Sequence, residues 1–180
     1  MKIAACVLTA FVAISASGQE AAPVKDFQKR VDEYMKVRKT ASAQIPKLAK
    51  KAEPEQIAAN ERAQADAIRE ARANAAHGDI FTPAASAYFR SVIREYMAGD
   101  RPAKETAKQG NPAEEGAAKV TLKVNAKYPD SAPLSTVPPG LLLKLPELPK
   151  EIDYRFVGRH LVLHDAQAGI IIDFLPNAMP

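Results

Sequence analysis

Apolar residues recur at helical spacing in the first half of the chain. Between residues 24 and 45 they follow each other at steps of three and four, which places them on one face of a helix. Pro46 should end or kink this helix, because its ring fixes the backbone and removes a hydrogen-bond donor. The predicted face, which includes one arginine, consists of Val24, Phe27, Val31, Tyr34, Met35, Arg38, Ala41 and Ile45.

A second helix is predicted over residues 54–77. Pro54 suits the first turn of a helix, and Gly78 suits the position just past the end. The apolar stripe between them is thin and consists mainly of alanine, so a neighbouring helix could approach closely. Its residues are Ile57, Ala58, Ala65, Ile68, Ala71 and Ala75.

A third helix is predicted over residues 83–98. Thr82 suits the N-cap, Pro83 the first helical position and Gly99 the stop. We therefore expect residues 19–116 to form a region of antiparallel helices. The apolar face of the third helix is rich in large residues, namely Tyr88, Phe89, Val92, Ile93, Tyr96 and Met97.

Alternation of apolar and polar residues replaces helical spacing near the C-terminus, in residues 151–180. Two short alternating runs flank Gly158 and Arg159, and a two-residue loop with glycine first is typical of a type II′ β-hairpin. One face of this hairpin must be buried, which fixes the register. The predicted pairs are Phe156 with Leu161 and Tyr154 with Leu163 on the buried face, and Asp153 with His164, Arg155 with Val162 and Val157 with His160 on the other.

A third strand is predicted over residues 170–175, after a four-residue loop at 166–169. Gly169 suits the left-handed position of that loop. The tail then forms a three-stranded antiparallel β-meander. The register that extends the buried face pairs Ile172 with Leu163 and Phe174 with Leu161.

The residues between the helices and the meander divide into two segments. Apolar and polar residues alternate over 117–128, which indicates a possible strand. Residues 129–150 are rich in proline and leucine, and we expect an extended strap packed on the helical body. The fold class is therefore α+β. A docking motif for a partner protein is the alternative for the strap, and the contact residues would be Leu141, Leu142 and Leu143, with Arg155 on the meander.

Residues 1–18 have the pattern of a secretory signal peptide. Lys2 precedes an apolar run over 3–14, and small residues follow, so we expect cleavage after Gly18. Cys6, the only cysteine in the sequence, would leave with this segment. The mature protein would then lack disulfides, thiolate catalysis and cysteine-ligated zinc. We expect it to be periplasmic or secreted, with no transmembrane segment after cleavage.

Charge is nearly balanced, with 25 Lys+Arg against 21 Asp+Glu and a formal net charge of +4. This excess is too small to favour nucleic-acid binding. Residues 25–51 are mostly basic and residues 53–79 mostly acidic, so the first two helices carry opposite charge. We favour a hairpin whose charged flanks face each other. A basic helix that binds anionic lipid or polysaccharide is the alternative.

Few groups in the sequence suggest chemistry. His160 and His164 fall on one face of a predicted strand, about 13.6 Å apart by strand geometry, so an unbroken strand prevents them from sharing a metal. Asp153 opposite His164 could hold an ion weakly, but we favour a solvated acid–imidazole pair. We therefore expect no metal and no other cofactor. Motifs of nucleophile elbows, zinc proteases and phosphate-binding loops are absent from the sequence, so we expect no catalytic role.

The tail YRFVGRHLVLHDAQAGIIIDFLPNAMP, residues 154–180, resembles the C-terminus of uncharacterised secreted bacterial proteins with no assigned function. Its pattern of three strands separated by Gly-Arg and by Asp-x-x-x-Gly is also similar to the tails of small periplasmic proteins linked to nickel and cobalt homeostasis. Export, the apolar strap and the missing catalytic motifs predict a non-catalytic protein that binds an envelope protein. A metal- or stress-related envelope protein and a hydrolase with a spatially assembled site are the alternatives.

Overall fold

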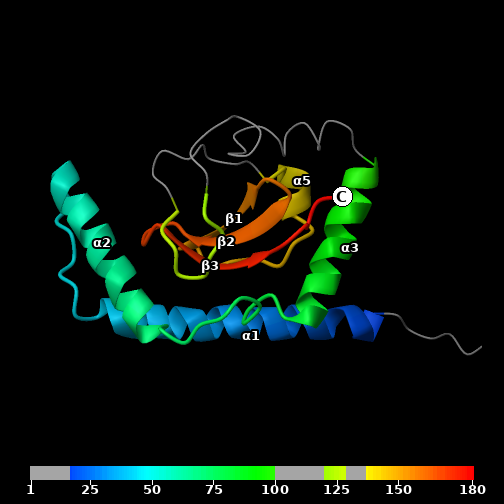
Figure 1. Ribbon diagram of the computed structural model, residues 1–180, viewed down its shortest axis with the longest axis horizontal. Helices are drawn as coiled ribbons and strands as arrows, with labels where there is room; N and C mark the ends of the chain where they lie inside the picture. Colours follow the sequence, from blue (N-terminus) through cyan, green and yellow to red (C-terminus); the bar gives the residue numbers. More distant parts are fainter. Residues whose placement is uncertain (1–16, 100–119, 129–136) are drawn as a thin grey trace, which may run out of the picture.

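The computed structural model describes residues 17–99, 120–128 and 137–180 (Figure 1). It confirms the α+β class, with helices first and a three-stranded antiparallel sheet at the C-terminus. The predicted signal segment lies outside the described residues, apart from its last two residues, which open the first helix. The elements are α1 (Ser17–Ser42), α2 (Pro54–Ala71), α3 (Pro83–Gly99), α5 (Pro139–Leu142), β1 (Ile152–Val157), β2 (His160–Asp165) and β3 (Ile170–Leu175).

The long helix α1 forms the base of the molecule, and α2 and α3 rise from it with the sheet between them (Figure 1). α1 contacts both of these helices. α2 runs towards α1 and α3 runs away from it, so α1 crosses the two and does not lie antiparallel beside either (Figure 1). The helices therefore form an open frame around the sheet, in place of the antiparallel packing along α1 that the sequence suggested.

The second helix is shorter than its predicted range. It ends at Ala71, whereas the prediction extended to residue 77. Arg72 leaves the helix and donates hydrogen bonds to the Asn125 side chain and to the carbonyl oxygen of Ile172 on β3. These tertiary contacts turn the chain towards the sheet at this point. The third helix keeps its predicted bounds within one residue.

An aromatic cluster joins the helices to the sheet. The ring of Phe89 on α3 lies 4.8 Å from the ring of Phe27 on α1 and 5.9 Å from the ring of Tyr154 on β1. Phe81, in the loop before α3, packs edge-on against Phe89 at 5.1 Å. Burial of each such side chain stabilises the fold by about 1.5–3 kcal/mol. The sheet contributes Ile152, Phe156, Leu161, Leu163, Ile170, Ile172 and Leu175 to the same core.

The hairpin of β1 and β2 has the predicted register in every pair. Phe156 faces Leu161, and Asp153 faces His164. Gly158 opens the two-residue loop with a φ of 58°, which glycine adopts without steric strain. The short loop therefore leaves the two strands only one way to pair.

The register of β2 and β3 differs from the prediction because β3 contains a β-bulge. Ile172 is an extra residue in β3, at the point where the pairing shifts. The predicted pairs of Ile172 and Phe174 are therefore wrong. Phe174 lies with the small cluster on the outer face of the sheet, and Asp173 turns to the inner side. The observed pairs are Asp165 with Ile170, His164 with Ile171, Leu163 with Asp173, Val162 with Phe174 and Leu161 with Leu175.

The possible strand over 117–128 does not form as a named strand in its described part, from residue 120 onward. Its last residues pair only briefly with the start of β3, through a bridge between Lys127 and Ile170 and backbone hydrogen bonds that join residues 125–128 to residues 169–171. Asn125 turns the chain with a φ of 64°. The alternation of apolar residues reflects packing against the outer face of the sheet, beside this short pairing. The apolar residues that pack there are Val120, Leu122 and Tyr128.

The strap predicted over 129–150 is described from residue 137 onward. It packs on the body as expected, because Val137, Leu141 and Leu145 are buried in the main core. Its conformation differs from the extended one predicted, since the helical turn α5 forms at Pro139. Proline in the first turn costs no helical hydrogen bond, which explains why this turn forms inside a proline-rich segment.

Candidate functional site

Asp165, at the end of β2, is fully buried and joins the meander to α1. Its Oδ2 atom accepts hydrogen bonds from Tyr34 Oη at 2.7 Å and from Arg38 Nε at 2.6 Å. Its Oδ1 atom accepts the backbone N–H groups of Gln167 and Ala168 at 3.0 and 2.9 Å. Burial and the adjacent Asp165 carboxylate raise the pKa of Tyr34 above its ordinary value, so the phenol stays a donor. These donors compensate for the water that the carboxylate has lost.

Asp173 on β3 is a second fully buried carboxylate. It accepts the backbone N–H groups of Ile80 and Phe81 at 2.9 Å each, of Gly78 at 3.0 Å and of Phe174 at 2.8 Å. These bonds hold the loop before α3 on the sheet. They also explain the bulge, which turns Asp173 towards these donors.

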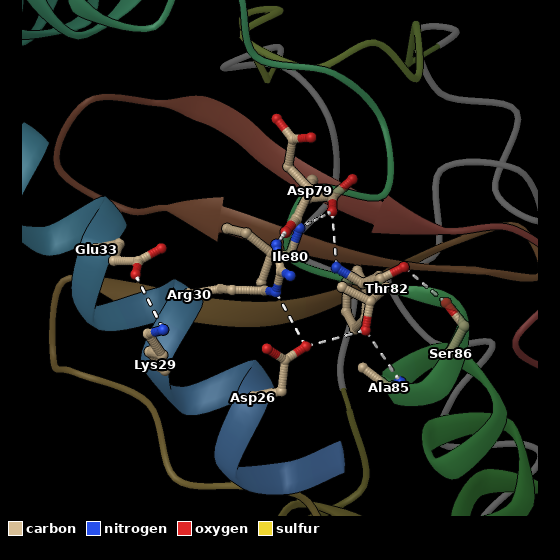
Figure 2. A network of polar contacts seen from close by, with 11 residues as sticks. Asp26, Lys29, Arg30, Glu33, Asp79, Ile80, Thr82, Ala85 and Ser86 are labelled. Carbon is tan, nitrogen blue, oxygen red and sulfur yellow. Dashed lines mark hydrogen bonds and ion pairs between the residues drawn. The ribbon is translucent and has the colours of Figure 1, made fainter. Parts of the chain in front are cut away.

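A partly exposed polar network continues from that loop to α1 and α3 (Figure 2). Arg30 donates from Nη1 to the carbonyl oxygen of Asp79 at 2.7 Å and from Nε to Asp26 at 3.0 Å. Thr82 Oγ1 donates to Asp26 at 3.3 Å and accepts the N–H of Ala85 at 3.4 Å, which confirms the predicted N-cap. The network fixes the start of α3 against α1.

A pocket of about 500 Å³ lies where α1 ends. Its walls come from the last turn of α1, the following loop, the N-terminal half of α2 and the turn after β2. The loop and α2 lie together at this end of α1 (Figure 1). Ligand pockets typically have volumes of about 300–1,000 Å³, so this one is large enough for a small molecule or a short peptide segment.

Exposed aliphatic side chains form one part of the pocket lining. Leu48 is 43% exposed and Ile57 is 49% exposed. These two residues are half of the four large exposed hydrophobics in the described part of the chain. Ile45 lines the same pocket. The pocket thus offers aliphatic surface that the fold itself leaves in water.

Polar groups form the rest of the lining, and most are fixed by hydrogen bonds. Arg38 Nη2 donates to Gln167 Oε1 at 2.6 Å, which joins α1 to the β2–β3 turn. Asn60 Nδ2 donates to the carbonyl oxygen of Pro46 at 2.8 Å, which ties the loop to α2. The hydroxyl oxygen of Ser42 is buried and has no hydrogen-bond partner within the described structure. The lining therefore combines preorganised polar groups with one unsatisfied hydroxyl.

The structure brings two of the three predicted metal candidates together. His164 Nδ1 lies 3.0 Å from Asp153 Oδ1, and Arg155 donates to the same carboxylate at 3.0 and 2.8 Å. Burial alone would raise the pKa of Asp153, but the hydrogen bonds from His164 and Arg155 outweigh it and lower this pKa. His160 lies apart and accepts the N–H of Asn177. The described residues contain no group of three or more His, Cys, Asp or Glu suited to a metal ion.

The four residues predicted to contact a partner differ in how exposed they are. Leu141 is fully buried, so its prediction as a contact residue is wrong. The Arg155 side chain is only 13% exposed and lies over the Tyr128 ring at 5.2 Å, so it serves the fold. Leu142 and Leu143 are 45% and 89% exposed and remain available to a partner.

The pocket was not predictable from the sequence, because its residues come from three distant stretches. They lie in residues 38–48, 57–64 and 166–167. The one local signal was Arg38, a charged residue on an otherwise apolar helical face. A charge in that position needs a buried partner, but its sequence neighbours do not identify Asp165 as that partner.

Comparison with protein-family models, with curated proteins and with solved structures found no match for this chain. Among the residues that the structure describes, no helix is long and apolar enough to cross a membrane. The fold and the pocket are therefore the basis for a functional proposal.

Proposed function

We propose that this protein is an exported, non-catalytic protein of the cell envelope that binds a segment of another protein in the pocket at the end of α1. One observation carries the proposal: the exposed side chains of Leu48 and Ile57 share a concave site with fixed polar groups. Binding pockets typically combine apolar walls with a few placed polar groups in this way.

A polypeptide segment suits this lining better than other ligand classes. The amides of Asn60, Gln64 and Gln167 donate and accept hydrogen bonds, as the groups of a peptide backbone do. The described lining residues include no aromatic ring on which a nucleobase would stack. They also include no histidine or cysteine, the ligands that transition metals prefer.

The roles of the buried reactive groups support a non-catalytic protein. The two buried carboxylates, Asp165 and Asp173, accept backbone N–H groups that fix turns and loops. Ser86 donates its hydroxyl to the carbonyl oxygen of Phe81 at 2.9 Å. His164 is paired with Asp153. Each of these groups therefore has a partner that maintains the fold.

Export is supported by the sequence of residues 1–18. A positive residue, Lys2, precedes an apolar run, and small residues follow at the expected cleavage point. An exported protein meets its partners in the envelope or outside the cell. The partner segment proposed for the pocket would therefore belong to an envelope protein.

Reversible cross-linking in cells, followed by purification and mass spectrometry, tests the proposal. We compare the wild-type protein with a Leu48→Ser, Ile57→Ser variant and with a matched Leu142→Ser, Leu143→Ser variant. Both variants change two exposed leucine or isoleucine side chains, so neither should unfold the protein. We expect the pocket variant to lose the dominant envelope partner and the α5 variant to retain it. Loss of the partner only in the α5 variant would move the binding site to α5 and refute the pocket.

A further inference from the structure

We propose that the pocket recognises an acidic residue of the partner segment, whose carboxylate binds between Arg38, Ser42 and Lys47. This inference rests on the proposed function, because it specifies the chemistry of the segment held in the same pocket. Three observations carry it: an unused donor of a fixed guanidinium, an unsatisfied hydroxyl one helical turn further along α1, and a basic loop at the pocket wall.

Arg38 supplies the fixed donor. Its side chain is nine-tenths buried, and it lines the pocket. Nε is bonded to Asp165 and Nη2 to Gln167, which holds the guanidinium plane in place. Within the described structure the hydrogen bonds of this side chain come from Nε and Nη2, so the Nη1 group remains for a ligand. A guanidinium binds carboxylates well because its planar N–H groups match the carboxylate oxygens.

Ser42 lies one helical turn after Arg38, on the same face of α1. Its hydroxyl oxygen is buried and unpartnered within the described residues, and it lies at the pocket wall. A buried unsatisfied hydroxyl destabilises the free protein. Rotation about the Cα–Cβ bond would turn this hydroxyl towards a ligand carboxylate. The bound carboxylate would then give the Ser42 hydroxyl the hydrogen-bond partner that it lacks in the free protein.

The charges around the pocket favour an anionic group on a peptide. The charge of Arg38 is compensated by its ion pair with Asp165. The net positive charge near the pocket therefore comes from Lys47 in the lining and from Lys50 and Lys51 in the same exposed loop. Glu61 on α2 is the one carboxylate in the described lining. It can accept an N–H group of the ligand. A lining with basic groups and one acceptor suits a peptide with an acidic side chain better than it suits a simple anion, because a simple anion has no N–H group for the acceptor.

A pair of peptides that differ only in charge tests the inference. Acetyl-Gly-Asp-Leu-Gly-amide and its Asn counterpart are titrated into the ¹⁵N-labelled protein, and backbone amide shifts are followed at 42–48, 57–64 and 166–167. We expect the Asp peptide to bind about tenfold more tightly, the difference typical of a charged hydrogen bond. Equal binding of both peptides would overturn the carboxylate inference and leave the pocket function standing. If neither peptide shifts these amides, both the carboxylate inference and the pocket function are refuted.

Two variants locate the carboxylate, and a third is the matched control. Ser42→Ala and Lys47→Gln should each reduce the preference for the Asp peptide about threefold or more. Ser42→Ala removes an unpaired hydroxyl, so it should not lower the stability of the fold. Lys29→Gln, at a 75% exposed side chain on α1 outside the pocket lining, should leave the preference unchanged. A preference that survives both pocket variants would overturn the assignment.

Discussion

At the scale of single residues, Asp165 positions a whole element. Tyr34 and Arg38 lie one turn apart on α1, and both donate to the same oxygen of this carboxylate. The other oxygen caps the turn that follows β2. One buried charge therefore sets the rotation of α1 relative to the sheet, and it fixes the wall of the pocket that contains Arg38 and Gln167.

Replacement of Asp165 by asparagine should therefore destabilise the protein strongly. The change leaves the Arg38 guanidinium buried beside a neutral amide, which typically costs about 3–5 kcal/mol. Urea unfolding of the variant measures this loss. The control is Asp66→Asn, since Asp66 is 75% exposed and pairs with Arg69 at the surface. That change should cost less than about 1 kcal/mol, and equal losses in the two variants would contradict the account.

Buried tyrosines predict how stability changes in alkali. Burial raises the pKa of Tyr34 and of Tyr154 above the ordinary value. The unfolded chain releases these protons near pH 10 while the folded protein keeps them, so stability is full below about pH 10 and falls above it. Each such tyrosine contributes a slope of about 1.4 kcal/mol per pH unit.

The free energy of unfolding should therefore fall less steeply with pH in the Tyr34→Phe variant. The difference in slope should be the contribution of one tyrosine. Urea unfolding of the wild type and the variant between about pH 9 and pH 11 measures the two slopes. The comparison uses slopes because the variant also loses the hydrogen bond to Asp165. Identical slopes would show that Tyr34 is not the group protected from ionisation.

At the scale of elements, local sequence predicted those features that depend on local geometry. The Gly158-Arg159 loop allows only one strand register, and every predicted β1–β2 pair is confirmed. Thr82 and Pro83 set the start of α3 in the same way. Turn and cap residues act on the adjacent backbone, so a sequence pattern is sufficient to predict them.

Features that depend on distant partners were not predictable from the sequence. The bulge in β3 serves the bonds between Asp173 and amides almost one hundred positions earlier, such as that of Ile80. The early end of α2 reflects the contacts of Arg72 with Asn125 and Ile172. The pocket likewise is lined by residues from three stretches that are far apart in the sequence. No local pattern contains these pairings, because the partners meet only in the folded chain.

A pair of glycine variants tests the β2–β3 turn. Gly169 has a φ of 59°, and a Cβ atom there would only displace the flexible end of the Glu61 side chain. Gly169→Ala should therefore destabilise the protein by about 1–2 kcal/mol through left-handed backbone strain alone. At Gly99, at the end of α3, a Cβ atom meets nothing within 4 Å. Gly99→Ala should be neutral or stabilising by less than about 1 kcal/mol, and thermal unfolding distinguishes the two.

At the scale of the whole molecule, the helical frame and the meander form one body. The aromatic cluster, Asp165 and Asp173 join elements that are far apart in the sequence. We therefore expect the amides of Ile80 and Phe81 to exchange with solvent as slowly as those of β2, by global unfolding. Hydrogen exchange measured by NMR tests this expectation. Much faster exchange of the two loop amides would show that the loop opens independently.

The distribution of exposed aliphatic side chains over the whole molecule indicates where a partner would bind. The helices are joined to the sheet by buried contacts at Asp165 and Asp173, and aliphatic side chains stay exposed in the pocket and at α5. The pocket combines such side chains with preorganised polar groups, whereas α5 presents leucines alone. A partner segment with both apolar and acidic side chains should therefore prefer the pocket.

The most direct test places a photo-reactive amino acid at Ile57 in cells, with controls at Leu143 on α5 and at Ala87, an exposed position on α3. After irradiation, mass spectrometry identifies both the partner and its cross-linked residue. We expect one dominant adduct from position 57, to a segment of an envelope protein with an acidic residue beside an aliphatic one. No adduct from position 57, or the same adducts from all three positions, would contradict this expectation.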